Sequence, residues 1–271
     1  MPRFTRRNFL TGLVAAAGVY LTAVVTHSKP FKIASGIASI GSSGIEEELE
    51  AEYNLRLYGD TSAVSVTNLS LLLNHLSQNW DNFYRHMEFV QRIDLSSAYL
   101  PEGGVCAADT KRRLMIVDPN FIDNSVDGSK EMSFNSSYIV HELAHFWTEY
   151  YPMHEGYPTH EELWNSINPS DYYFRLEENE REKSAKIYSD YNFKEDIAVL
   201  AQSVYLAKFG IGSTVWGYLN NICGIDGISK KLNLLGELGY ISSNERDIAI
   251  ANLNYNVTSS SLFSQPAKIY S

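Results

Sequence analysis

Apolar residues recur every three or four positions along most of the chain, which predicts a mainly helical protein. The clearest stripe predicts one long amphipathic helix that packs on a globular core. Its members are Leu69, Leu72, Leu76, Trp80, Phe83, Met87 and Val90. An earlier acidic segment, 46–58, has apolar residues four positions apart at Leu49, Tyr53 and Leu57, and this spacing also favours a helix.

The helical pattern is interrupted in the middle of the chain. A Pro-Glu-Gly-Gly break at 101–104 precedes a segment in which the apolar run 114–117 predicts a strand. Two short runs around Asp109-Thr110-Lys111 are typical of a hairpin. The polar stretch 118–133 predicts a loop. The pattern as a whole therefore predicts an α+β fold that is mostly helical.

Helical spacing returns in the last third of the chain. A helix is expected to start near Asn192, and its apolar stripe is formed by Ile197, Leu200, Ala201, Val204 and Ala207. Two further helices are expected over 228–238 and 244–253, as scaffold that closes a lower lobe. Residues 258–271 are interpreted as a flexible tail.

The first thirty residues have the layout of an export signal. Arg6 and Arg7 precede an uncharged apolar run from Leu13 to Val25, as in a secretory leader. The arginine pair resembles the twin-arginine signal of bacteria, which predicts a periplasmic or extracellular location. An uncleaved membrane anchor is the alternative, although the run is shorter than the roughly 20 residues that a bilayer requires. Residues 31–45 are interpreted as a tether.

The remaining chain, 46–257, has the length of one domain. The net charge of all 271 residues is −10, and residues 1–30 hold four basic and no acidic residues, so the rest carries −14. A body this acidic disfavours binding to nucleic acid or to anionic lipid. Cys106 and Cys223 are compatible either with a disulfide or with two buried thiols.

The motif with the strongest chemical meaning is His141-Glu142-Leu143-Ala144-His145. Histidines four apart on a helix lie one above the other, so both imidazoles can bind a single zinc ion. Glu142 can then act on a water at that ion as a general base. The helix is expected to begin near Ser136 or Ser137 and to end before Pro152.

The packing face of the HExxH helix and the role of two earlier histidines can also be predicted. The residues expected to pack inward are Val140, Leu143, Ala144, Trp147 and Tyr151. His75 and His86, on the long stripe, have no partner at metal-ligand spacing and are interpreted as structural.

A hydrolytic zinc site needs a third protein ligand. Thr148 and Tyr151 occupy the positions where a metzincin has Gly and His, so that class is excluded. Glu195, in the first turn of the helix that starts near Asn192, is the preferred third ligand. Its alternative role is the N3 position of a capping box with Asn192. The other candidate ligands are His154, His160 and Asp196, and Asp196 is also a candidate for orienting a zinc-bound imidazole.

HExxH followed by a distant Glu-Asp-x-Ala resembles the gluzincin peptidases. It is similar in particular to bacterial zinc-binding metallopeptidases related to the anthrax lethal-factor catalytic domain. The matching residues are Tyr188, Tyr191, Glu195, Asp196 and Ala198, with Trp164, Asn168, Pro169, Tyr172 and Tyr173 between the helices. Val199 stands where that family has an acidic residue. The resemblance implies a zincin-like fold, with a small sheet packed on the HExxH helix and a helical C-terminal lobe.

These observations predict an exported zinc metallopeptidase that acts on peptides or proteins. One Zn²⁺ per chain would be bound by His141, His145 and Glu195, with Glu142 as general base. Tyr188 or Tyr191 would donate a hydrogen bond to the oxyanion. Two alternatives are open: a zincin-scaffold envelope protein that binds a partner, and a zinc amidase that acts on the cell wall.

Overall fold

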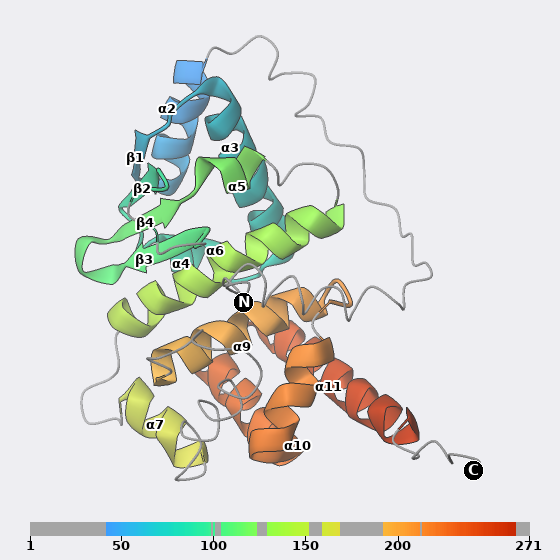
Figure 1. Ribbon diagram of the computed structural model, residues 1–271. Helices are drawn as coiled ribbons and strands as arrows, with labels where there is room; N and C mark the ends of the chain where they lie inside the picture. Colours follow the sequence, from blue (N-terminus) through green and yellow to red (C-terminus); the bar gives the residue numbers. More distant parts are fainter. Residues whose placement is uncertain are drawn as a thin grey trace, which may run out of the picture. The chain divides into compact units, whose positions relative to one another are not determined.

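The computed structural model describes residues 42–98, 100, 104–123, 129–151, 159–168, 192–211 and 213–263. Within each compact part of the chain, the elements can be followed in Figure 1. The chain divides into two compact units, Met1–Tyr151 and Pro152–Ser271. The predicted export signal lies outside the described residues, and none of the described helices is both long and apolar enough to cross a membrane. The elements confirm the α+β class with a mostly helical content.

The first unit contains a mixed four-stranded sheet in the order β1-β2-β4-β3. Its strands are β1 (Arg56–Gly59), β2 (Arg92–Leu95), β3 (Cys106–Asp109) and β4 (Leu114–Val117). Strands β1, β2 and β4 are parallel, and β3 pairs antiparallel with β4 at one edge. The predicted strand and hairpin are therefore confirmed. The hairpin turns through η2 (Thr110–Arg112) and Arg113, whose φ of 52° closes it.

Five helices accompany the sheet among the described residues of this unit. They are α2 (Ser42–Tyr53), α3 (Ala63–Asn79), α4 (Phe83–Met87), α5 (Pro119–Asp123) and α6 (Ser129–Tyr150). Helix α3 packs against α2, α5 and α6, while α6 packs against α4 and β3. The HExxH helix therefore lies directly against the antiparallel edge of the sheet (Figure 1).

The prediction of one long helix through the 69–90 stripe is wrong. All seven residues of the stripe are buried, but the helix ends at Asn79 and the chain is extended at Trp80. The Asn79 side chain donates to the carbonyl of His75 at 2.8 Å. A side-chain amide of this kind competes with backbone N–H groups for the carbonyl, which favours the end of a helix. After a short turn, Phe83 and Met87 of α4 are buried in the same core as the residues of α3.

The prediction of helix over 46–58 is also wrong beyond Tyr53. Helix α2 starts at Ser42, within the predicted tether, and ends before Asn54, whose φ is 51°. Asn tolerates this left-handed conformation better than most residues, and strand β1 follows. Leu57 is buried as expected, but from the strand. Its N–H donates to Glu50 Oε1 at 2.9 Å, so α2 shields this edge of the sheet.

The backbone conformation and the close neighbours of position 59, at the end of β1, require a glycine there. Its φ is +84°, and an added Cβ would lie 2.5 Å from the Leu95 carbonyl oxygen and 2.6 Å from Asp94 Oδ1. Gly210 has a similar φ of +67° with nothing within 4 Å of such a Cβ. A left-handed conformation by itself costs a residue with a side chain about 1–3 kcal/mol.

Gly59→Ala is therefore expected to lower the free energy of unfolding by more than that conformational cost, since the steric conflict adds to it. Gly210→Ala is the matched control, because it carries only the conformational cost. Urea denaturation of both variants beside the wild type measures the difference. Equal losses in the two variants would show that β1 and β2 separate easily at this point.

Helix α6 begins at Ser129, earlier than the predicted start at Ser136 or Ser137, so its first turn replaces part of the predicted loop. The serines are not caps but buried residues inside the helix. Ser137 Oγ donates to the carbonyl of Phe134 at 2.6 Å, which satisfies the hydroxyl without ending the helix. The predicted end is confirmed, since the helix stops at Tyr150.

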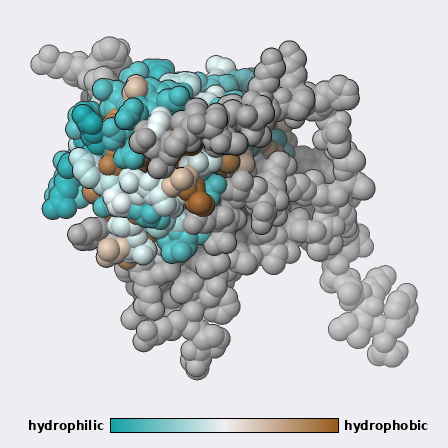
Figure 2. All heavy atoms as spheres, turned by 90° about the horizontal axis from the view of Figure 1, so that it is seen from above, coloured by the Kyte–Doolittle hydropathy of each residue, from teal (hydrophilic) through white to brown (hydrophobic). Residues whose placement is uncertain are grey.

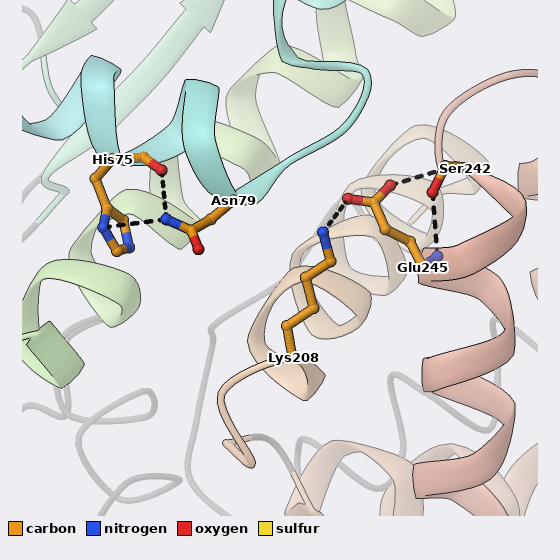
Figure 3. Close-up of polar contacts among 5 residues, drawn as sticks. All are labelled: His75, Asn79, Lys208, Ser242 and Glu245. Atoms are coloured by element: carbon orange, nitrogen blue, oxygen red, sulfur yellow. Dashed lines mark hydrogen bonds and ion pairs between the residues drawn. The ribbon is translucent and has the colours of Figure 1, made fainter. Parts of the chain in front are cut away.

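His75 and His86 have contacts of the kind expected for structural histidines. His75 Nε2 lies 3.1 Å from Ser133 Oγ. On the other side of the ring, Asn79 Nδ2 lies 3.4 Å from His75 Nδ1 (Figure 3). Burial lowers the pKa of His75, because the charged imidazole loses its hydration. His86 is fully buried, and its ring lies 4.3 Å from the rings of both Trp80 and Trp147.

The described elements of the second unit are all helices. They are α7 (His160–Ile167), α9 (Phe193–Ala207), α10 (Ser213–Glu237) and α11 (Ser243–Phe263). Helix α9 packs against the other three. Helix α10 is kinked at Gly224, whose φ of 69° is non-helical. Helix α11 continues to Phe263, past the predicted end at 253 and over the first residues of the predicted tail.

Figure 2 shows one face of the molecule coloured by hydropathy. The described residues on this face are mostly hydrophilic, and the hydrophobic ones form small separate spots. Isolated spots of this kind are normal for a folded protein surface.

Candidate metal centre

Helix α6 presents the two histidines of the HExxH motif as a pair. His141 is buried and His145 is half-buried, and their Nε2 atoms are 3.3 Å apart. In a tetrahedral zinc site with Zn–N bonds of about 2.0–2.1 Å, two nitrogen ligands are separated by about 3.3 Å. The imidazoles are therefore already spaced as two corners of such a site.

The rest of α6 holds this pair in place. The predicted inward residues Val140, Leu143, Ala144 and Trp147 are all buried, and Tyr151 stacks on Trp147 at 4.2 Å. Side chains that are locked by close packing in this way restrict the rotation of the helix. The direction in which the imidazoles point is thus set by the core of the first unit.

Glu142 is buried as well, with a relative exposure of 5%. Removing a carboxylate from water is costly unless donors or a nearby cation compensate. Its neighbour in sequence is His141, so a metal ion held by the histidine pair would supply positive charge close to it. The burial of Glu142 therefore fits a role beside a cation.

Helix α9 presents the predicted third ligand. Asn192 is the N-cap, as expected, and its Oδ1 accepts from the N–H groups of Lys194 at 2.9 Å and Glu195 at 3.3 Å. The predicted apolar stripe is buried on the inner side of the helix. Glu195 is half-buried in the first turn, which the cap holds at a defined position.

The structure groups His141, His145 and Glu195 as side chains that can hold a metal ion. Each offers one ligand atom, and these three atoms all lie within 4.8 Å of one another. Among the described residues this is the one group of three or more metal-binding side chains. Two imidazoles and one carboxylate form a donor set that suits zinc and leaves a fourth position for water.

The other candidate ligands have different positions. His160 is buried at the start of α7, with its ring 6.0 Å from that of Tyr240, and it is not part of the group. His154, Tyr188 and Tyr191 lie outside the described residues. Cys106 is buried in β3, and the side chain of Cys223 is not among those described. Val199 is half-buried on α9.

Asp196 has contacts that the sequence did not reveal. Its Oδ2 accepts from Trp164 Nε1 at 2.6 Å and from Lys231 Nζ at 2.7 Å. Both side chains of the Asp196–Lys231 ion pair have a relative exposure of 1%. The predicted contact between Asp196 and a zinc-bound imidazole stays a prediction. Lys231 was missed, although its position among the buried residues Ile228, Leu232 and Leu235 of α10 is a signal for a buried partner.

No family model, no curated protein and no solved structure matches this chain. Its function is therefore inferred from the chemistry of its own residues.

Proposed function

We propose that the protein is an exported zinc-dependent metallopeptidase. The observation that carries the proposal is the grouping of His141, His145 and Glu195, whose ligand atoms lie within 4.8 Å of one another. An Nε2–Nε2 distance of 3.3 Å within that group matches the spacing of ligands on zinc. When bound, zinc would lower the pKa of a water molecule towards neutrality and polarise the scissile carbonyl.

Glu142 is the proposed general base. It follows His141 directly on α6 and is shielded from bulk water. Its carboxylate would accept the proton of the attacking water and pass it to the leaving amine. Tyr188 and Tyr191 are the proposed donors to the oxyanion, from the sequence resemblance alone.

The sheet offers a place for an extended substrate. Strand β3 is at the edge of the sheet, antiparallel to β4, and packs against α6. Such an edge can pair with an extended peptide through main-chain hydrogen bonds. The opposite edge, β1, is shielded by Glu50, so β3 is the favoured edge.

The test begins with metal content and hydrolysis. Purified protein should contain close to one zinc per chain and should hydrolyse fluorescently labelled casein. A chelator should abolish the activity, and added zinc should restore it. Protein that contains no transition metal and takes none up would overturn the proposal.

The same experiment separates the two alternatives. Zinc binding without hydrolysis of casein or peptidoglycan would favour a non-catalytic envelope protein, with which Val199 at the acidic position of the family is compatible. Digestion of purified peptidoglycan with no cleavage of casein would favour a cell-wall amidase.

A further inference from the structure

We propose that the buried ion pair of Asp196 and Lys231, together with Trp164, positions Glu195 for metal binding by fixing the rotation of α9. The proposal rests on the proposed function, because it assigns a positioning role toward the same metal. The three residues come from three different helices of the second unit, α9, α10 and α7.

The contacts converge on a single atom. Asp196 Oδ2 accepts from the indole N–H of Trp164 at 2.6 Å and from the ammonium of Lys231 at 2.7 Å. The ammonium also lies 5.3 Å from the centroid of the Trp164 ring. All three side chains are at most 1% exposed, so water does not compete for these bonds.

Helix geometry transmits this constraint to Glu195. Successive residues of an α-helix are rotated by about 100° around its axis, so the direction of one side chain sets the direction of the next. Asp196 is held towards α7 and α10, and Glu195 must then point about a third of a turn away. Asn192 defines where the helix starts, and Asp196 defines how it is rotated.

An apolar contact could not fix the rotation as sharply. Buried ion pairs are costly to desolvate and are often no more stabilising than apolar residues of similar volume. Their hydrogen bonds, however, are directional, so the carboxylate is satisfied in only one rotation of α9. A directional anchor is valuable next to a residue that must reach a metal, because small displacements weaken coordination.

The second unit contains a suitable comparison at the other end of α9. Lys208, the C-cap residue, forms an ion pair of 2.7 Å with Glu245, whose other oxygen accepts from the N–H of Ser242 (Figure 3). Glu245 is 1% exposed, so this pair is also largely buried. Lys208 lies thirteen residues beyond Glu195, at the far end of α9, so this pair should not affect metal binding.

The experiment compares two double variants of the full chain. Asp196→Asn with Lys231→Met removes both charges, while the Asn oxygen can still accept from Trp164. Lys208→Met with Glu245→Gln removes the comparison pair, while the Gln oxygen can still accept from Ser242. Zinc affinity is measured by competition with a chromophoric chelator, the visible spectrum of the Co²⁺ form reports the coordination geometry, and thermal unfolding of the metal-free protein reports stability.

We expect the first double variant to bind zinc about 10- to 100-fold more weakly, as is typical for residues that orient a ligand. Its Co²⁺ spectrum should also change. The comparison variant should keep the affinity and spectrum of the wild type even where its melting temperature falls. Unchanged zinc affinity in the first variant, or an equal loss in both variants, would overturn the positioning role.

Trp164→Phe provides a second measurement should the first double variant fail to fold. It keeps an aromatic, although smaller, ring and removes the indole N–H, and zinc affinity should fall while the protein stays folded. An unchanged affinity would again overturn the proposal. If the wild type itself takes up no zinc, the proposed function fails together with the positioning role; loss of the positioning role alone leaves the wild-type site intact.

Discussion

Replacement of Glu142 by Gln is expected to leave bound zinc in place and to slow hydrolysis of labelled casein about 100- to 10,000-fold, the usual contribution of a general base. Gln has nearly the same shape as Glu but cannot accept a proton. Glu142 is the single acidic residue of the HExxH motif, so no other carboxylate of the motif can take over its role as base. Zinc content and hydrolysis rate, measured on the same preparation, separate metal binding from catalysis.

Glu149→Gln is the control for this variant. Glu149 is an exposed residue of the same helix, so the substitution removes an equal charge without touching the site. It should keep both zinc and activity. If the Glu142→Gln variant hydrolysed casein as fast as the wild type, another group would have to take the proton, and Glu142 would not be the general base.

Replacement of Glu195 by Ala should weaken zinc binding by more than about 100-fold, because the loss of a direct ligand exceeds the loss of a residue that only orients one. The two remaining imidazoles would leave two coordination positions to water instead of one. Competition with a chromophoric chelator gives the affinity, and hydrolysis should fall with metal occupancy.

Glu161→Ala serves as its control, since Glu161 is an exposed acidic residue in the first turn of α7. Zinc affinity should be the same as in the wild type. Tight binding in the Glu195→Ala variant would contradict the ligand assignment and would return His154, His160 and Asp196 as candidates for the third position.

Features that depend on neighbours in the sequence were predicted well. The spacing of His141 and His145 is enough to place two imidazoles on one side of a helix, and the structure brings their Nε2 atoms to 3.3 Å. The stripe of α9 and its Asn192 cap were predicted for the same reason. The hairpin of β3 and β4 joins strands that are close in sequence, so its turn residues reveal it.

Features that depend on distant contacts were predicted poorly. Strands β1 and β2 have four residues each and pair in parallel with partners far along the chain, so neither has a local signature. The apolar spacing of 46–58 runs from α2 into β1 and does not reveal where the helix ends. Leu57 fits the spacing of a buried helix position, but it is buried from the strand. The serines at 136 and 137 are typical caps by type, but they are interior residues because α6 begins seven residues earlier, at Ser129.

The amino-acid sequence by itself determined the helical character of the chain, the histidine pair and the glutamate between them, because each depends on residues within one or two helical turns. Only the structure groups Glu195, fifty residues beyond His145 in the sequence, with the two histidines as side chains that could hold a metal ion. It also decided that Asp196 is bound to Lys231 and Trp164. The contacts of Asp196 depend on how α7, α9 and α10 pack, and helix packing is set by the sum of many contacts that no short stretch of sequence contains.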